Sequence, residues 1–278
     1  MSDTSSPYAI RAHDVSKVYP EKLSSFSIRK EGMAVVRGWL NRHTEEDTTT
    51  EQGPRGFTAL QGISFDVEPG SSIAFVGRNG SGKTTLIRLL ANIMRPTTGS
   101  IEVNGRYSAL IGLGTGFIRD MTGRENIYLN AAIYGVPPHE TEEIIDEIIA
   151  FADIGAFIDR PVDEYSSGMN ARLGFSVAVH ILPDIVMIDE ALAVGDTAFK
   201  RKCNEKLDAL LSENRTLVLV SHSDRDVLRL CDRAIWLHQG NMMLDGEVKH
   251  VLREYNQFMN PKTAAKPRPA KKQKPQPG

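Results

Sequence analysis

The chain has 278 residues, of which 41% are hydrophobic and 24% are charged, so it can bury the core of one large domain or of two joined subdomains. The net charge is −2, but residues 261–278 carry six basic and no acidic side chains, which leaves a balance of −8 in the other 260 residues. An acidic body argues against a nucleic-acid partner, because such partners require basic surfaces.

No apolar run of about 18 residues is present, and the N-terminus lacks the apolar segment of a signal peptide. We therefore predict a protein of the cytosol that reaches a membrane only if another molecule anchors it. Cys203 and Cys231 have no CxxC spacing and no partner cluster, which predicts two reduced thiols.

The order of apolar runs predicts strands and helices that alternate along the chain. Residues 8–19 indicate a short strand, and residues 57–76 indicate a hairpin that leads into a buried strand at 72–76. A helix over 83–94 and a strand and turn over 99–105 follow. Residues 107–180 are predicted to be helical. Further strands are expected at 184–190 and 216–222, with a final hairpin over 234–246. This order predicts an α/β core with an inserted helical subdomain.

Two segments interrupt this pattern. Within an insertion at about 20–56, residues 27–40 place Ile28, Val35, Val36 and Trp39 near one helical face, beside several basic residues. Such a helix could lie on a membrane or dock on a membrane protein, or it could simply pack on the core. The tail over 260–278 has five prolines and is expected to be disordered, either as a solubilising tail or as a weak contact for anionic lipids.

Residues 77–85, GRNGSGKTT, fit the G-x-x-x-x-G-K-[ST] pattern between a predicted strand and a predicted helix. Glycines let the loop turn backbone N–H groups toward a phosphate, and the helix N-terminus favours the same negative charge. We expect Lys83 to reach the β- and γ-phosphates and Thr84 to bind Mg²⁺. The nucleotide-binding residues assigned here are Gly77, Arg78, Asn79, Gly80, Ser81, Gly82, Lys83, Thr84 and Thr85.

Asp189, Glu190 and His222 stand at the ends of two later apolar runs. A carboxylate such as Asp189 can hold Mg²⁺, usually through water. Glu190 could orient or deprotonate an attacking water, and a surface ion pair is its alternative role. His222 could bond the γ-phosphate, although a histidine at a strand end can also be purely structural. We assign catalytic roles to Glu190 and His222 and a metal-binding role to Asp189.

The stretch YSSGM, residues 165–169, places hydroxyls and a glycine at the start of another predicted helix. A helix start of this kind is a second anion-binding surface. Because the chain has one phosphate loop, we predict that Ser166, Ser167 and Gly168 close on the nucleotide of a second copy in a twofold dimer.

These motifs, in this order, resemble those of the nucleotide-binding subunits of ABC transporters. GRNGSGKTT is similar to the Walker A motif, YSSGM to the signature, IVMIDE to Walker B, ALAVGD (191–196) to the D-loop, and His222 to the switch histidine. The resemblance covers roughly residues 8–258. It implies an α/β P-loop NTPase of the ABC ATPase fold, with a RecA-like core, an antiparallel β-subdomain and an inserted helical subdomain. It further implies that Tyr19 stacks on the adenine ring, unless Tyr19 is an ordinary strand-end residue.

The stretch 114–135, together with YSSGMNARLGFS and DEALAVGD, resembles the ATPases of bacterial polysaccharide exporters, which move O-antigen, capsule, teichoic acid or galactan chains. Two departures stand out. Tyr165, Ser167 and Met169 replace common signature residues, and residues 107–120 contain no glutamine to contact the metal, although Gly114, Gly116 and Phe117 occupy that loop.

The resemblance implies an ATP- and Mg²⁺-dependent ATPase that forms a homodimer on an integral-membrane permease, at the cytoplasmic face of the inner membrane. The implied cargo is a lipid-linked polysaccharide, recognised by its lipid-diphosphate anchor or by the permease, since no carbohydrate-binding domain is expected after Met259. A galactan is one specific possibility. The alternatives are a soluble ABC ATPase that acts on nucleic acid or ribosomes, and a small-molecule kinase that uses the same phosphate loop.

Overall fold

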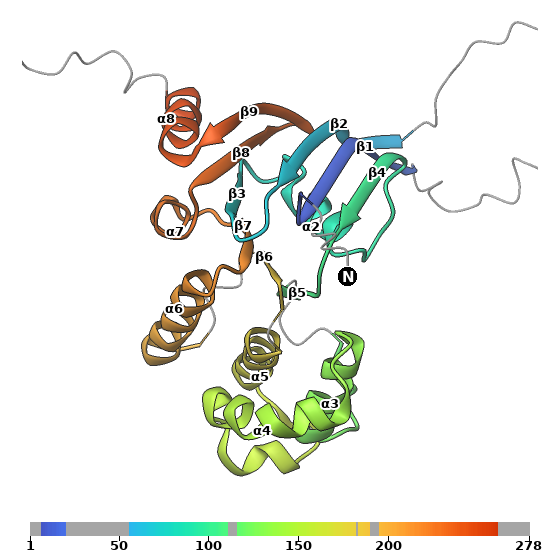
Figure 1. Ribbon diagram of the computed structural model, residues 1–278, viewed down its shortest axis with the longest axis vertical. Coiled ribbons are helices and arrows are strands. Elements are labelled where there is room, and N and C mark those ends of the chain that lie inside the picture. The colour runs from blue at the N-terminus through green and yellow to red at the C-terminus, as the bar shows by residue number, and fades with distance from the viewer. Residues whose placement is uncertain (1–6, 21–55, 111–115, 182, 190–194, 261–278) are drawn as a thin grey trace, which may run out of the picture.

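The computed structural model describes residues 7–20, 56–110, 116–181, 183–189 and 195–260, and they form two sheets and a block of helices (Figure 1). The smaller sheet has the order β2-β1-β4 and is antiparallel. Its strands are β1 (Ile10–Pro20), β2 (Gly56–Val67) and β4 (Thr98–Val103). The predicted insertion at 20–56, with its basic helix, and the tail after Asn260 lie outside the described residues, apart from the terminal residues Pro20 and Gly56.

The predicted hairpin within residues 57–76 is wrong. Residues 56–67 form the single strand β2, which pairs with β1. Gly62 has a φ of 59° near a shift in this register, so the strand bulges there and continues instead of turning back. The next strand, β3 (Ser72–Val76), belongs to the other sheet.

The larger sheet has the order β5-β6-β7-β3-β8-β9, and its strands are parallel except for β9. The remaining strands are β5 (Tyr107–Leu110), β6 (Ile185–Asp189), β7 (Thr216–Val220), β8 (Arg233–His238) and β9 (Asn241–Glu247). Residues of β3 and β7 are buried throughout, which explains their continuous apolar runs. The predicted strands at 184–190 and 216–222 and the final hairpin are confirmed.

The prediction that the helical region begins at residue 107 is wrong for residues 107–110. They form β5, which pairs in parallel with β6 inside the larger sheet. The helical block therefore begins only after Leu110. The predicted helix over 83–94 is also shorter than expected, because α2 (Lys83–Leu90) ends before Asn92, which has a φ of 52°.

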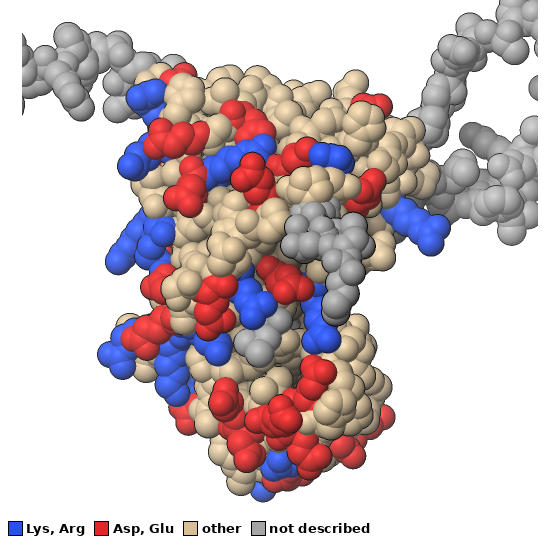
Figure 2. All heavy atoms as spheres, viewed as in Figure 1, with Lys and Arg blue, Asp and Glu red and all other residues tan. Residues whose placement is uncertain are grey.

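The other helices are α3 (Gly123–Ile133), α4 (Pro138–Ala152), α5 (Ser167–His180), α6 (Thr197–Ser212), α7 (Asp224–Leu230) and α8 (Val248–Met259). The helical block consists of α3, α4, α5 and two short 3-10 turns. As predicted, α4 turns its isoleucines inward, with Ile145 and Ile148 buried and Ile144 and Ile149 packed at the edge. Its opposite face is acidic, and Figure 2 shows Asp and Glu side chains spread over the visible face of this block.

Helix α5 joins the helical block to the larger sheet because it contributes to two hydrophobic clusters. Phe175, Ala178 and Val179 pack with side chains of β6, β7 and α6. Leu173 and Val177 pack with side chains of α3 and α4. Helix α5 is therefore fixed by contacts to both parts of the molecule.

The predicted thiols are buried and unpaired. Burial raises the pKa of the Cys203 thiol to about 12 and raises that of Cys231 as well. Within the described ranges, no helix is both long enough and apolar enough to cross a membrane.

Candidate nucleotide-binding site

Residues 77–82 connect β3 to α2 and fold as a tight loop. Gly77, Gly80 and Gly82 have φ angles of 150°, 78° and 107°, a region that side chains rarely tolerate. Space also matters at Gly82, the N-cap of α2, where a Cβ atom would lie 2.7 Å from the carbonyl oxygen of Ala59. These glycines let the loop wrap closely around the amino end of α2, where unpaired N–H groups favour an anion.

Lys83 is the first residue of α2 and is buried, with 5% of its surface exposed. Its Nζ donates to the carbonyl oxygens of Gly77 at 2.7 Å and Arg78 at 2.9 Å. The ammonium group thus lies inside the curve of the loop. A positive charge held there is suited to a phosphate that enters the loop.

The turn between β8 and β9 forms a backbone hydrogen bond with the phosphate loop. Ser81 is buried, and its carbonyl oxygen accepts a 3.1 Å hydrogen bond from the N–H of Gly240. The carbonyl oxygen of Gly240 in turn accepts from the N–H of Gln61 at 2.9 Å. Because β2 and the β8–β9 turn both contact the loop, its shape is set before any ligand arrives.

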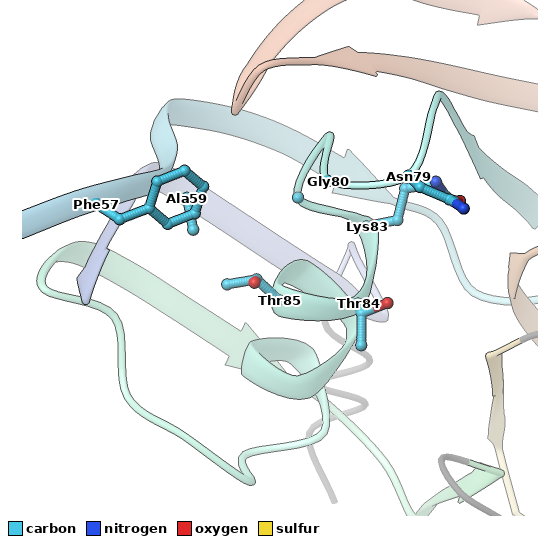
Figure 3. A pocket seen from close by; sticks show the side chains of 8 residues that line it. Phe57, Ala59, Asn79, Gly80, Lys83, Thr84 and Thr85 are labelled. Carbon is cyan, nitrogen blue, oxygen red and sulfur yellow. The ribbon is translucent and has the colours of Figure 1, made fainter. Parts of the chain in front are cut away.

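A cavity of about 370 Å³ opens in front of this loop (Figure 3). It is lined by Phe57, Ala59, Asn79, Gly80, Gly82, Lys83, Thr84 and Thr85. Phe57 and Ala59 come from β2, and the others come from the loop and α2. A concave site with one apolar wall and one polar, positively charged wall matches a ligand that has a flat ring and a phosphate chain.

Phe57 is the functional candidate that sequence reasoning missed. It is 65% exposed, although phenylalanine is usually buried, and its ring stands across the cavity from Thr85 (Figure 3). Tyr19, the predicted adenine-stacking residue, is its direct cross-strand partner but is absent from the described residues that line the cavity. The Tyr19 hydroxyl lies 3.4 Å from Thr85 Oγ1 and 3.4 Å from Met94 Sδ.

The predicted metal and switch residues lie at the carboxyl edge of the larger sheet. Asp189 ends β6 opposite Val220, the last residue of β7, and Phe75 of β3 also pairs with Val220. Three features therefore lie at the carboxyl ends of adjacent strands: the phosphate loop after β3, Asp189 at the end of β6, and the chain from β7 to His222. Open α/β sheets bind ligands at this edge. His222 is exposed, and Glu190 lies outside the described residues.

Thr84 and Asp189 supply oxygen atoms, the ligand type that Mg²⁺ prefers. Mg²⁺ usually keeps water and binds substrate phosphates in addition to one or two protein oxygens, so this donor set fits it. No group of three His, Cys, Asp or Glu side chains that could hold a metal occurs in the described part of the chain. Gly116 has a φ of 108° and Phe117 packs on the helical block, whereas Gly114 lies outside the described residues.

The second predicted anion surface forms the N-terminus of α5. Ser166 is the N-cap, and its Oγ accepts a 3.2 Å hydrogen bond from the N–H of Met169. Ser166, Ser167 and Gly168 are exposed and are absent from the described lining of the phosphate cavity. This surface is therefore not part of the described cavity at the chain's own phosphate loop.

Tyr165 explains one departure from the usual signature. It is 8% exposed, packs in the helical block, and donates a 2.6 Å hydrogen bond to the carbonyl oxygen of Phe157. It is therefore a core residue that fixes the turn before Ser166. Gly123 of α3 lies so close to the Tyr165 hydroxyl that a side chain there would collide with it.

A strand, phosphate loop and helix at the carboxyl edge of a mostly parallel sheet define the class of P-loop nucleotide-binding proteins. The model of the ABC transporter family matches residues 60–193. The O-antigen export system ATP-binding protein RfbB of Klebsiella pneumoniae is 42% identical over 205 residues, which are 74% of this chain and 83% of that protein. The chain therefore belongs to the ABC transporter family.

Two further relatives are longer. The chain is 47% identical over 204 residues to the ABC transporter protein AbcA of Aeromonas salmonicida and covers 66% of it. It is 46% identical over 204 residues to the teichoic acids export ATP-binding protein TagH of Enterococcus faecalis and covers 45% of that protein. In both cases the matched residues are 73% of this chain. The chain thus spans roughly half to two thirds of these two proteins.

Solved structures agree with the fold. The ATP-binding subunit of an ABC transporter superposes with a TM-score of 0.69 at 20% identity, over 89% of this chain and 93% of that one. An ATP-binding cassette described as a dimer in a post-hydrolysis state with ADP and Pi gives a TM-score of 0.64 at 18% identity, over 86% of this chain and 98% of that one. The predicted ABC ATPase fold is confirmed.

Proposed function

We propose that the chain is the ATP-hydrolysing subunit of an exporter that moves a lipid-linked polysaccharide across the cytoplasmic membrane. The observation that carries this proposal is the phosphate loop and its cavity, in a chain that is 42% identical to an O-antigen export protein along most of that protein's length. Similarity to a teichoic acids export protein supports the same class of cargo. Both named cargoes are cell-envelope polymers.

ATP binds with its phosphates against the loop at Gly80 and Gly82 and with its base toward the apolar wall at Phe57. Lys83 gives up its contacts with the carbonyls of Gly77 and Arg78 to neutralise the β- and γ-phosphates. Thr84 and Asp189 hold Mg²⁺, which supplies charge neutralisation on the phosphate chain. His222 bonds the γ-phosphate, and Glu190 orients the attacking water.

The exposed serines of α5 complete the site of a second copy. Ser166, Ser167 and the N–H groups that follow them present donors to the γ-phosphate bound by the partner's loop. ATP then joins two copies, and hydrolysis removes the γ-phosphate that both copies hold. The dimer opens as a result, and this cycle drives the membrane subunit.

A permease docks in a groove between the two parts of the molecule. The groove has a volume of about 470 Å³ and lies between the end of α2, β5 and the end of α3. Ile93 and Ile133 line the groove, and 59% and 66% of their respective surfaces are exposed, which is unusual for isoleucine. A short amphipathic helix of a membrane protein is the occupant that fits, because its apolar face would cover both side chains. This contact places the ATPase at the cytoplasmic face of the membrane.

Complementation of a deletion strain tests the proposal. Cells that lack the protein should accumulate lipid-linked polysaccharide on the cytoplasmic side, and the wild-type gene should restore surface polymer. Lys83→Ala should fail to restore it, whereas Lys249→Ala, a change of an exposed lysine on α8, should succeed. Normal surface polymer in the deletion strain would refute the proposal.

The same purified protein separates the alternatives. An exporter subunit should co-purify with a membrane protein in detergent, and its ATPase rate should respond to that protein and not to RNA. Stimulation by RNA or ribosomes would favour the soluble ABC ATPase, and transfer of the γ-phosphate to a small molecule would favour the kinase.

A further inference from the structure

The turn that carries His222 is short and is held by its own hydroxyl groups. β7 ends at Val220, and Ser223 is the N-cap of α7. Only Ser221 and His222 lie between them. The Oγ of Ser221 accepts a 3.0 Å hydrogen bond from the N–H of Ser223, and the Oγ of Ser223 accepts a 3.3 Å hydrogen bond from the N–H of Asp226. The direction of His222 therefore depends on where α7 begins.

The C-terminal helix α8 holds the beginning of α7. Asn256 Nδ2 donates a 2.8 Å hydrogen bond to Oδ2 of Asp224, the first residue of α7. The two helices are neighbours (Figure 1), and the buried side chains of Val227 on α7 and Leu252 on α8 belong to one hydrophobic cluster. Helix α7 therefore rests on α8 through apolar contacts and is bonded to it at its first residue.

Asn256 stands at a position where the helical pattern favours an apolar residue. Val248 and Leu252 are buried, and Asn256 follows them at the same spacing of four. Residues four apart lie on one face of a helix, so Asn256 is a polar residue at the end of an apolar stripe. An amide adds little to apolar packing, and the partner that the structure gives it is the Asp224 carboxylate.

The last turns of α8 also lie close to the phosphate loop. The ring of Tyr255 packs edge-on against Trp236 of β8, with 5.8 Å between the ring centres. Burial raises the pKa of Tyr255, the carboxylate of Asp224 raises it further, and the positive charge of Arg78 acts in the opposite direction. Both charged groups are therefore within electrostatic range of the Tyr255 hydroxyl. Helix α8 thus borders two segments that meet the nucleotide in the proposed function.

We propose that Asn256 is a positioning residue that sets the direction of His222 toward the γ-phosphate. This inference rests on the proposed ATPase, in which His222 bonds that phosphate. Asn256 is absent from the described lining of the phosphate cavity, so it acts by holding Asp224, and with it the start of α7, against α8. Without this bond the start of α7 shifts, and His222 meets the γ-phosphate in a poorer geometry.

The test uses the full chain with four variants: Asn256→Ala, Asn256→Asp, the exchange Asn256→Asp/Asp224→Asn, and Asn204→Ala. In the exchange the amide and the carboxylate trade places, so the same hydrogen bond can form in reverse. Asn204→Ala is the matched control, because Asn204 Oδ1 accepts a 2.6 Å hydrogen bond from Nη2 of Arg229 on the last turn of α7. It loosens the far end of the same helix. For each variant, kcat and KM for ATP, the dissociation constant for ATP and the melting temperature are measured.

Asn256→Ala should lower kcat about 2- to 12-fold, the range for loss of one hydrogen bond, and leave the dissociation constant for ATP within about twofold. Asn256→Asp should be slower still, because two carboxylates then face each other. The exchange should return kcat to within about twofold of the wild type, since the bond is restored. Asn204→Ala should keep the wild-type kcat.

A double variant tests whether the effect passes through His222. If it does, adding Asn256→Ala to His222→Ala should cause no further loss of rate, whereas independent effects would add. Single-turnover hydrolysis with protein in excess over ATP measures these residual rates.

A wild-type kcat in Asn256→Ala, no recovery in the exchange, an equal loss in Asn204→Ala, or additive losses in the His222→Ala background would each overturn the inference. Where His222→Ala hydrolyses ATP too slowly for the comparison, the exchange decides. Failure of the proposed function looks different: the wild-type chain itself would then bind no ATP, and Lys83→Ala would change nothing.

Discussion

Tyr19 and Phe57 are direct partners across the β1–β2 ladder, yet the ring that borders the phosphate cavity is Phe57. Directly opposed residues in an antiparallel pair point to the same face, so both rings lie on the side of α2. The Tyr19 hydroxyl is directed at Thr85 and Met94 and thereby contacts α2 itself. The exposed face of Phe57 is the one that borders the cavity.

Phe57→Ala is therefore expected to weaken ATP binding about 5- to 150-fold, because stacking of a base on an aromatic ring contributes about 1–3 kcal/mol. Inorganic tripolyphosphate should bind Phe57→Ala as it binds the wild type, since it has no base. Equilibrium binding of both ligands measures the difference. Tyr19→Phe, which removes only the hydroxyl, is the control for the α2 contact, and unchanged ATP affinity in Phe57→Ala would contradict the assignment.

Ser166→Arg should prevent ATP-dependent dimerisation by placing a long side chain on the exposed helix start. It also removes the N-cap of α5, which costs about 1 kcal/mol and lowers Tm by about 2–4 °C. Ser166→Asn keeps the cap and separates the two effects. Sedimentation with ATP measures the dimer, and Thr122→Ala, which removes the cap of α3, should lower Tm but still dimerise.

Glu190→Gln should slow ATP hydrolysis by about 10²- to 10⁴-fold, the range for loss of a general base, with ATP affinity retained. The ATP-bound dimer should then persist long enough to isolate by gel filtration. Single-turnover hydrolysis gives the rate. A Glu190→Gln variant that turns over like the wild type would place the base elsewhere.

Stability should depend on the titration of His180 at mildly acidic pH. Burial lowers the pKa of His180, against a smaller opposing effect of its hydrogen bond with the carbonyl oxygen of Ser176. The folded protein therefore favours the neutral ring, so this contribution is complete above about pH 6.5, the unfolded value, and is lost as the pH falls from there toward the lower folded pKa. Melting curves from pH 7.5 to 5 should show a steeper loss in the wild type than in His180→Gln. Equal slopes would contradict the prediction.

The α/β core and the phosphate loop could be predicted from the sequence because both depend on local signals. A four-residue apolar run followed by Asp189 and a glycine-rich loop that leads into Lys83 specify their own structure with little help from distant residues. The boundary at Tyr107 was wrong because YSAL is too short for strand alternation to be recognised. Only its partner β6, some 80 residues later, makes it a strand.

Contacts between distant residues account for what the sequence did not predict in the site. Phe57 borders the cavity because β2 pairs with β1 across the insertion, and no spacing within residues 56–67 indicates which face meets the phosphate loop. The hydrogen bond from Asn256 to Asp224 joins residues 32 positions apart through their side chains. Motifs identify residues that touch a ligand, whereas the residues that hold them in place are found through tertiary contacts.

The position of β7 has a practical consequence for anyone who wishes to shorten this chain. The family match ends at residue 193, but β7 begins at Thr216 and lies between β3 and β6 in the sheet. A fragment cut to the matched span would keep the phosphate loop and Asp189 and lose the strand that holds them side by side. Without β7, the strands β3 and β6 would each present an unpaired edge. Such a fragment should precipitate instead of binding nucleotide.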